Sequence, residues 1–284
     1  MRRLLAVLWS GSSSPAAGGQ AGTPRPVKTG YAPVNGLQLY YEIHGEPHAG
    51  RVPLLLIHGG GSSIHATWGQ AIPLLARNRL VIALDEQGHG RTKAIDRPFT
   101  FENSADDAAA LLDYLEVGRA DVMGFSNGGS ITLRVGLLHP GKVRKLVPIS
   151  CQYRRDGMVV GFWDGFKDAR LEMMPKPLRD FDLRMNGPEH PQQMFDQDLK
   201  RMAGFQDWPE RDLTGIAAPT LVVVGDRDIV TTEHAVKMSK LIPNARLMIV
   251  PGNHGDFLGQ LEVRRQGSPV PAAVMELVET FLDE

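Results

Sequence analysis

The sequence predicts an α/β fold in which helices cover both faces of a mostly parallel central sheet and a helical segment is inserted late in the chain. Apolar runs typical of buried strands alternate with segments of helical spacing in residues 29–150 and again in residues 215–284. Residues 151–214 lack such a run and are rich in Met, Phe, Trp and Pro. We therefore assign the first two ranges to the core and the third to a helical cap.

The composition is that of an ordinary globular protein. A chain of 284 residues with 42% hydrophobic residues can bury a sizeable core. Its net charge of −1 lacks the basic excess of a nucleic-acid-binding protein. No run approaches the roughly 18 apolar residues that a membrane span requires. The single cysteine, Cys151, excludes an internal disulfide.

Residues 1–28 are expected to lie outside the folded core. Arg2 and Arg3 followed by residues 4–9 look like the start of a signal peptide, although this apolar run is shorter than usual. Residues 10–22 are rich in Ser, Gly, Ala and Pro, a composition that cannot bury enough surface to fold. We predict disorder here and favour a cytoplasmic location, with export left open.

The first strands are predicted from a turn signal. Asn35-Gly36 precedes the alternating run 37–43, a pattern typical of a tight hairpin, which we place at the edge of the sheet. Residues 52–57 are continuously apolar, as expected of a strand that helices cover on both faces. A helix over residues 66–76 and a buried strand over residues 80–84 follow.

A second helix is predicted from Asn103 to Leu115, with acidic residues in its first turn, where the helix dipole favours negative charge. It leads into the apolar run 120–125, which turns abruptly into the helical spacing of residues 130–138. The remaining core elements are strands over 143–149, 220–224 and 246–250 and helices over 232–241 and 272–282.

Ser126 lies at this abrupt turn and is our candidate nucleophile. It forms a G-x-S-x-G motif with Gly124 and Gly128. A nucleophile elbow holds its serine in a strained backbone conformation, and side chains two residues away would collide where strand and helix crowd together. Glycine removes the collision. The flanking strand and helix are the context that this motif requires.

Three further motifs accompany the elbow in the chain, namely His58-Gly59-Gly60-Gly61, residues 85–90, and the pair Asp228 and His254. With these four motifs at strand ends, the chain resembles the α/β-hydrolase superfamily from about Tyr31 to Leu282. The resemblance implies a cap between the sixth and seventh core strands and a catalytic triad in the chain order serine, acid, histidine.

The resemblance implies a role for each triad member. Ser126 would attack a carbonyl carbon, and His254 would accept the serine proton and return it to the leaving group. Asp228 would orient the imidazole and stabilise its charged form. A competing carboxylate, Asp226, lies two residues earlier; the family spacing after the strand-ending glycine favours Asp228, and we expect Asp226 to cap the loop.

The resemblance also implies an oxyanion hole made of backbone N–H groups from Asn127 and from Gly60 or Gly61. His58 and His89 precede glycines and are expected to support loops near the site. No pair of histidines has metal-ligand spacing, so we expect neither a metal nor a cofactor.

The cap segment holds the densest supply of large apolar side chains in the sequence. About half of them are expected to form the cap's own core. The others favour an acyl chain or an aromatic group over a charged substrate. Our candidates for substrate contact are Phe162, Trp163, Phe166 and Met185.

These residues predict a cofactor-independent serine hydrolase that cleaves a small-molecule carboxylic ester or lactone through an acyl-enzyme. Serine at the elbow, where some relatives carry aspartate, argues against haloalkane dehalogenase or epoxide hydrolase chemistry. Three alternatives stay open: carbon–carbon bond hydrolysis of a ring-cleavage product, a perhydrolase-like side activity in which peroxide replaces water, and a non-catalytic module that binds a ligand or a protein partner. The physiological substrate and the oligomeric state, a homodimer included, also stay open.

Overall fold

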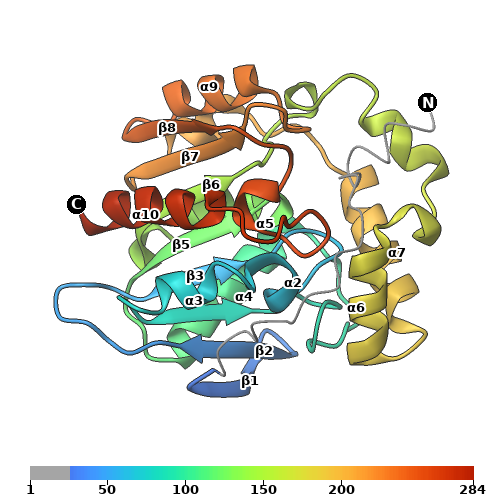
Figure 1. Ribbon diagram of the computed structural model, residues 1–284, viewed down its shortest axis with the longest axis horizontal. Coiled ribbons are helices and arrows are strands. Elements are labelled where there is room, and N and C mark those ends of the chain that lie inside the picture. The colour runs from blue at the N-terminus through green and yellow to red at the C-terminus, as the bar shows by residue number, and fades with distance from the viewer. Residues whose placement is uncertain (1–25) are drawn as a thin grey trace.

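The computed structural model describes residues 26–284 (Figure 1). The predicted disorder and the signal-like run therefore lie almost entirely outside the described residues. The first strand begins at Lys28, and the N–H of Val27 already donates to the carbonyl of Ile43 at 2.7 Å. The folded core thus begins at the end of residues 1–28, the segment that the sequence predicts to lie outside the core.

Eight strands form one sheet in the order β1-β2-β4-β3-β5-β6-β7-β8 (Figure 1). The first two pair antiparallel with each other, and β2 pairs antiparallel with β4, whereas every later pairing is parallel. The predicted mostly parallel sheet is confirmed. The strands are β1 (Lys28–Val34), β2 (Leu37–His44), β3 (Leu54–Ile57), β4 (Val81–Leu84), β5 (Ala120–Phe125), β6 (Val143–Ile149), β7 (Thr220–Gly225) and β8 (Ala245–Val250).

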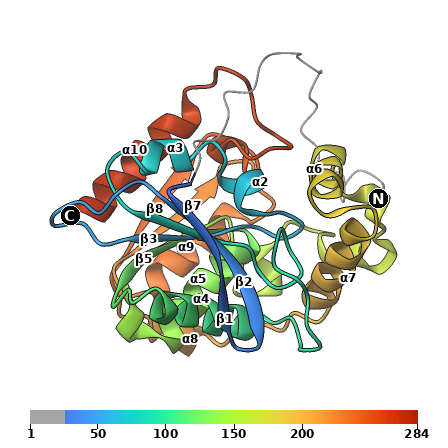
Figure 2. The same ribbon diagram turned by 90° about the horizontal axis from the view of Figure 1, so that it is seen from below.

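Helices cover both faces of this sheet (Figures 1 and 2). One face carries α2, α3 and α10, and the other carries α4, α5, α8 and α9. The α-helices are α2 (Ile64–Trp68), α3 (Ile72–Leu75), α4 (Phe101–Tyr114), α5 (Asn127–Leu138), α6 (Lys176–Asn186), α7 (His190–Ala203), α8 (Glu210–Thr214), α9 (Thr232–Leu241) and α10 (Val270–Asp283). Short 3₁₀ helices are η1 (Pro140–Lys142), η2 (Arg155–Gly157), η3 (Trp163–Asp168), η4 (Leu171–Met173) and η5 (Asp256–Leu258).

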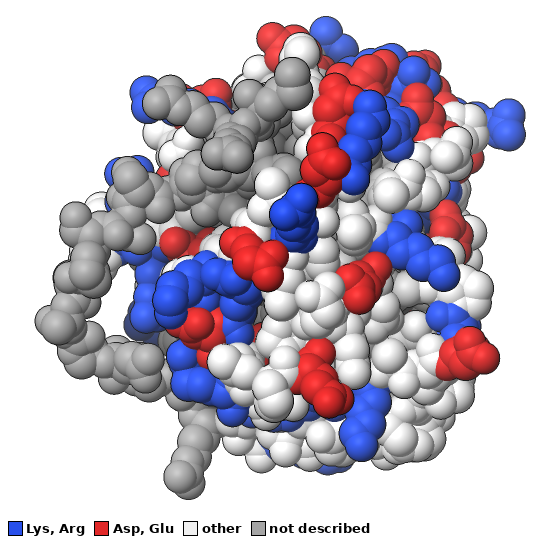
Figure 3. Space-filling view, turned by 90° about the vertical axis from the view of Figure 1, so that its right-hand side faces the viewer, with Lys and Arg blue, Asp and Glu red and all other residues white. Residues whose placement is uncertain are grey.

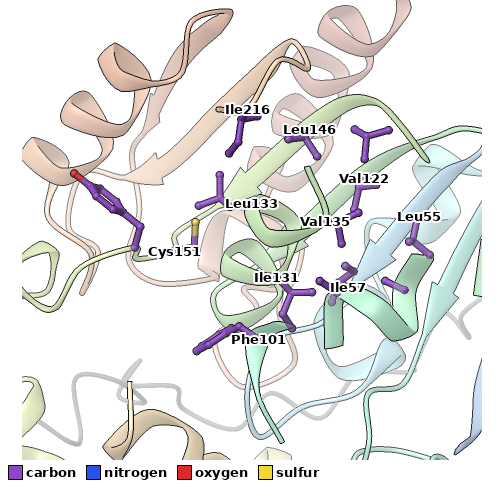
Figure 4. Packing of buried hydrophobic residues seen from close by; sticks show 14 of the residues in the cluster. Leu55, Ile57, Phe101, Val122, Ile131, Leu133, Val135, Leu146, Cys151 and Ile216 are labelled. Carbon is purple, nitrogen blue, oxygen red and sulfur yellow. The ribbon is translucent and has the colours of Figure 1, made fainter. Parts of the chain in front are cut away.

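Strand β3 shows why a continuously apolar run suits this position. Its side chains alternate between the two faces, and all four are fully buried. Leu54 and Leu56 pack in the cluster that contains residues of α3 and α10. Leu55 and Ile57 pack in the opposite cluster with residues of α4 and α5 (Figure 4).

The edge hairpin has the geometry that its sequence predicts. Asn35 and Gly36 have φ values of 49° and 82°, and Val34 pairs with Leu37 across the turn. Positive φ at both central residues is the signature of the two-residue turn that matches the twist of the flanking strands. Asparagine and glycine tolerate this conformation better than other residues.

Several helices differ from their predicted ranges; α5 begins three residues early and α10 two residues early. Instead of one helix over residues 66–76, the chain forms the short helices α2 and α3. Pro73, in the first turn of α3, lacks an N–H and would collide with the carbonyl of Gly69 in a continuous helix. Helix α4 begins at Phe101, two residues early, because the hydroxyl of Thr100 accepts the N–H of Asn103 at 3.1 Å and caps the helix.

The insertion between β6 and β7 is helical, and α6 and α7 lie to one side of the sheet (Figures 1 and 2). Helix α8, at its end, packs on α5 and α9 as part of the core layer. On the face that carries α6 and α7, acidic and basic side chains are interspersed over the part that the structure describes (Figure 3). Within residues 26–284 no helix has the length and apolar character needed to cross a membrane.

Candidate active site

The turn from β5 to α5 places Ser126 in a strained backbone conformation, with φ 56° and ψ −119°. A side chain at Gly124 would bring its Cβ within 2.0 Å of the Gly128 carbonyl oxygen. A Cβ at Gly128 would lie 2.3 Å from the carbonyl oxygen of Ile57. Both neighbours are backbone atoms that cannot move aside, so the turn accepts only glycine at these two positions.

Three chain segments meet beside this turn. Nε2 of His254, in the loop after β8, lies 3.1 Å from Oγ of Ser126. Nδ1 of His254 lies 2.7 Å from Oδ1 of Asp228, in the loop after β7. Because a carboxylate only accepts, Nδ1–H donates to Asp228, which leaves Nε2 of the neutral ring to accept the serine hydroxyl. The ring of Phe125 packs on the imidazole, with 4.6 Å between ring centres.

Asp228 is held in place by several donors besides His254. Its Oδ2 accepts the hydroxyl of Ser150 at 2.5 Å, and its Oδ1 accepts the N–H of Val230 at 3.1 Å. Burial by itself raises the pKa of Asp228, but His254 and these hydrogen bonds outweigh it and hold the pKa below its ordinary value. The carboxylate is therefore ionised and oriented toward the imidazole.

Asp226, the competing carboxylate, has a different partner. Its Oδ1 accepts the N–H of Gly252 at 2.7 Å, and its side chain is exposed. This bond ties the loop after β7 to the loop after β8. The structure thus brings Asp228, and not Asp226, to His254.

Backbone N–H groups that could bind an oxyanion lie next to Ser126. Gly60, Gly61 and Asn127 all line the same cavity as the serine. The N–H of Gly61 donates to Oδ2 of Asp198, a residue of the cap helix α7. The N–H groups of Gly60 and Asn127 have no acceptor among the residues that the structure describes. Of the two glycines, Gly60 therefore has the free donor.

Asp198 was not anticipated from the sequence, and it joins the cap to the core. Besides Gly61, its carboxylate accepts from Nε2 of His89 at 2.9 Å and from Arg201 at 2.9 Å. Arg201 in turn donates to Oε2 of the buried Glu86 at 2.8 Å. Although burial raises the pKa of Asp198, these cationic partners hold it well below its ordinary value. In the sequence, the three-residue spacing of Asp198 and Arg201 on one helix indicates an ion pair between them. It does not indicate that the pair also contacts residues of the core.

His58 and His89 lie buried in the loops that surround the site. Nε2 of His58 accepts the N–H of Glu86 at 3.0 Å, and its Nδ1 donates to the carbonyl of Gly59 at 2.7 Å. Burial lowers the pKa of His58 below its ordinary value, which suits an accepting nitrogen. Burial also acts to lower the pKa of His89, but the Asp198 carboxylate outweighs it and raises that pKa overall. Both rings support loops, as their sequence positions predict.

The cavity in front of Ser126 is mainly apolar. The cap supplies most of its wall, including two of the four side chains proposed for substrate contact, Phe162 and Phe166. The other two do not line it. Trp163 stacks on Phe205 instead, with 5.6 Å between ring centres. Met185 lies in the last turn of α6, away from the cavity-lining Leu178 in the first turn. The remaining large apolar lining residues of the cap are Met158, Met173, Met174, Leu178, Phe195, Leu199 and Met202, and the core adds Phe125 and Ile229.

Two polar residues of the cavity wall come from a segment that the sequence analysis did not single out. Gln260 and Glu262 lie between η5 and α10 and line the same cavity as Ser126 and His254. No signal in the sequence marks them, because they belong to an irregular loop. Among residues 26–284, no cluster of three or more His, Cys, Asp or Glu side chains could hold a metal ion.

Comparison with known proteins places this geometry in a family. A family model for the alpha/beta hydrolase fold matches residues 52–182. The chain is 32% identical over 267 residues to the dihydrolipoyllysine-residue acetyltransferase component of the acetoin cleaving system of Pseudomonas putida, which covers 87% of this chain and 68% of that relative. It is 27% identical over 270 residues to the serine hydrolase BPHL of Homo sapiens, with 89% of each chain covered.

A shorter match covers only part of the chain. The 2-hydroxymuconate semialdehyde hydrolase of Pseudomonas sp. strain CF600 is 40% identical over 98 residues, or 34% of this chain and 35% of that relative. Among solved structures, the enol-lactonase of Burkholderia xenovorans LB400 superposes with a TM-score of 0.70 at 21% identity, over 89% of this chain and 100% of its own. The family model and the 32% identical relative show that the chain belongs to the alpha/beta hydrolase fold family.

Proposed function

We propose that the protein is a serine hydrolase that cleaves a carboxylic ester or lactone of a small, largely apolar molecule through an acyl-enzyme. The observation that carries this proposal is the continuous hydrogen-bonded chain from Ser126 through His254 to Asp228. A serine hydroxyl is a weak nucleophile on its own, and an adjacent imidazole held in one tautomer activates it. A structural serine requires neither partner.

In the first half of the reaction, Oγ of Ser126 attacks the carbonyl carbon while Nε2 of His254 takes its proton. Asp228 stabilises the imidazolium that forms. The tetrahedral oxyanion accepts the free N–H groups of Gly60 and Asn127, and a donor of this kind is typically worth about 10²–10³ in rate. His254 then protonates the leaving alcohol, which departs and leaves an acyl ester on Ser126.

The second half repeats these steps with water as the nucleophile. His254 removes a proton from the water as it attacks the acyl ester, and the oxyanion forms again at the same N–H groups. Collapse of this intermediate returns the proton to Oγ of Ser126 and releases the carboxylic acid.

The cavity wall supports an uncharged acyl or aromatic part of the substrate near the reacting carbonyl. Phe162, Phe166 and the cap methionines offer adaptable apolar contact on the side that faces Ser126. The relative named serine hydrolase and the structural neighbour named enol-lactonase are consistent with ester or lactone cleavage.

The test is hydrolysis of p-nitrophenyl esters from acetate to palmitate, with aliphatic and aromatic lactones beside them, by wild type and by Ser126→Ala. We expect wild type to turn over short or medium esters or lactones and the variant to lose this activity while remaining folded by circular dichroism. Labelling by a fluorophosphonate probe should likewise depend on Ser126. Turnover that survives in Ser126→Ala would refute the proposal.

Carbon–carbon bond hydrolysis is a second candidate, because the partial relative named 2-hydroxymuconate semialdehyde hydrolase matches at 40% identity. If no ester or lactone is hydrolysed but the probe labels Ser126, ring-cleavage products of aromatic compounds are the next substrates to assay. A serine that neither reacts with the probe nor supports turnover would instead favour the non-catalytic ligand-binding module.

A further inference from the structure

The cavity in front of Ser126 is lined by two carboxyl groups that the proposed reaction does not use, those of Asp198 and Glu262. Glu262 lines this cavity, and its Oε2 is buried without a hydrogen-bond partner among the described residues. The residue as a whole is partly exposed, whereas its Oε2 atom is buried. No Lys, Arg or His within residues 26–284 forms an ion pair with it. An enclosed carboxyl group without a partner calls for an explanation.

The segment that carries Glu262 is anchored to the core. The N–H of Leu261 donates to the carbonyl of Ala66 at 2.9 Å, and the N–H of Val263 donates to the carbonyl of Gln260 at 3.1 Å. Leu261 also packs against the small apolar cluster that contains Met174 of the cap. Glu262 therefore lies where core and cap meet, and the backbone N–H groups of both its neighbours, Leu261 and Val263, are hydrogen-bonded.

A second unpartnered acceptor accompanies Glu262. Gln260 is 3% exposed and lines the same cavity, and its Oε1 has no donor among the described residues. Each of these oxygens needs an N–H or O–H donor, and a primary ammonium brings three. Burying an unpaired carboxylate is costly, whereas an ammonium beside it compensates the charge and supplies hydrogen bonds.

The other acidic groups of the cavity region are already satisfied. Asp198 accepts from Gly61, His89 and Arg201, and Asp228 is paired with His254. In contrast, burial in the cavity raises the pKa of Glu262 to about 8, and a hydrogen bond from its own backbone N–H offsets this effect only in part. Glu262 is thus the acidic side chain of this cavity that remains available to a ligand.

We propose that Glu262, assisted by Gln260, recognises a protonated amino group on the substrate, so that the enzyme prefers amino-bearing esters over their uncharged counterparts. This inference rests on the proposed ester hydrolysis and adds a substrate class to it. The apolar cap would then bind the hydrocarbon part of the same molecule. Glu262 acts here as a specificity-determining residue and takes no part in bond cleavage.

The experiment compares benzyl esters in matched pairs that differ only by an ammonium in place of a methyl group or a hydrogen. The amino members are 2-aminohexanoate, 6-aminohexanoate and 8-aminooctanoate, and their partners are hexanoate, heptanoate and nonanoate. Release of benzyl alcohol gives kcat/KM for wild type, for the isosteric Glu262→Gln and for Glu276→Gln, an exposed glutamate of α10 that serves as the control.

We expect wild type and Glu276→Gln to prefer at least one amino ester by tenfold or more over its partner. Glu262→Gln should lose at least tenfold on that amino ester and change less than threefold on the uncharged partner. The proposal is overturned if no amino ester is preferred by wild type, or if Glu262→Gln keeps the preference.

Failure of ester hydrolysis itself gives a different result, because then neither member of any pair is turned over. Calorimetric binding of hexylammonium against 1-hexanol tests Glu262 in that case without any catalysis. Tighter binding of the ammonium by wild type, lost in Glu262→Gln, supports the recognition site. Equal binding of both compounds by wild type and variant refutes it.

Discussion

Nε2 of His89 and the Oδ2 carboxylate atom of Asp198 lie 2.9 Å apart, and this pair joins the loop after β4 to the cap helix α7. The same carboxylate oxygen accepts the N–H of Gly61, next to the proposed oxyanion hole. One cap side chain therefore couples the docking of the cap to the geometry of the loop beside Ser126. Its removal should affect both stability and activity.

We expect Asp198→Asn to lower the free energy of unfolding by about 2–4 kcal/mol, because His89 loses its carboxylate partner and Arg201 keeps only Glu86. We expect a loss toward the lower end of the range that is typical of breaking a buried ion pair, since the Asp198 side chain is 13% exposed. Urea denaturation measures the change, and limited proteolysis should cut the cap faster. Asp196→Asn, at an exposed position of the same helix, is the control and should be neutral. Equal stabilities of the two variants would contradict the coupling.

Asp228→Asn should lower kcat/KM by about 10⁴-fold, since the amide no longer holds His254 in the tautomer that accepts the serine proton. Asp226→Asn, two residues away, should cost less than tenfold because Asp226 bonds only the backbone of Gly252. Steady-state kinetics with one ester distinguish the two. The reverse ranking would overturn the assignment of the acid.

His234 makes a pH-dependent contribution to stability. Burial lowers the pKa of His234 to about 4, and its neutral Nε2 accepts the N–H of Tyr153 at 3.2 Å. The unfolded chain binds a proton at the ordinary pKa of about 6.5, so stability is complete above this pH and is lost as the pH falls toward 4. The loss can reach roughly 3 kcal/mol, at 1.36 kcal/mol for each pKa unit.

Urea denaturation of wild type and His234→Gln at pH 7.5, 5.5 and 4.5 tests this dependence. The glutamine carbonyl can accept the same N–H but does not titrate. We expect the stability difference between the two proteins to shift in favour of the variant as the pH falls. A difference that is independent of pH would show that His234 does not contribute.

The nucleophile elbow should tolerate no side chain at its glycines. In Gly124→Ala the new Cβ would meet a backbone carbonyl oxygen at 2.0 Å, so the strand and helix must separate. We expect loss of several kcal/mol of stability or no folded protein at all, as judged by soluble yield and thermal unfolding. Gly118→Ala is the control, because its Cβ would meet nothing within 4 Å. Near-normal stability of Gly124→Ala would contradict the crowding argument.

Features with a local physical cause were predictable from the sequence. The Asn35-Gly36 turn, the apolar strand β3 and the glycines around Ser126 each express a backbone conformation or a burial pattern that neighbouring residues reveal. The triad candidates came from the resemblance to the α/β-hydrolase superfamily, which implies the chain order serine, acid, histidine. In the core, the predictions were wrong mainly at helix boundaries, as at Pro73 and Thr100. In the cap, Trp163 and Met185 were wrongly expected to line the cavity.

Only the tertiary structure decided which cap residues reach the site. Phe162 lines the cavity, whereas its neighbour Trp163 stacks on Phe205, because the docking of the cap determines which side of each short helix faces Ser126. Asp198 and Glu262 were invisible in the sequence for the same reason. His89, a partner of Asp198, comes from a segment far away in the chain, and Oε2 of Glu262 has no partner among the described residues. Hydrophobic spacing in the sequence does not indicate either feature.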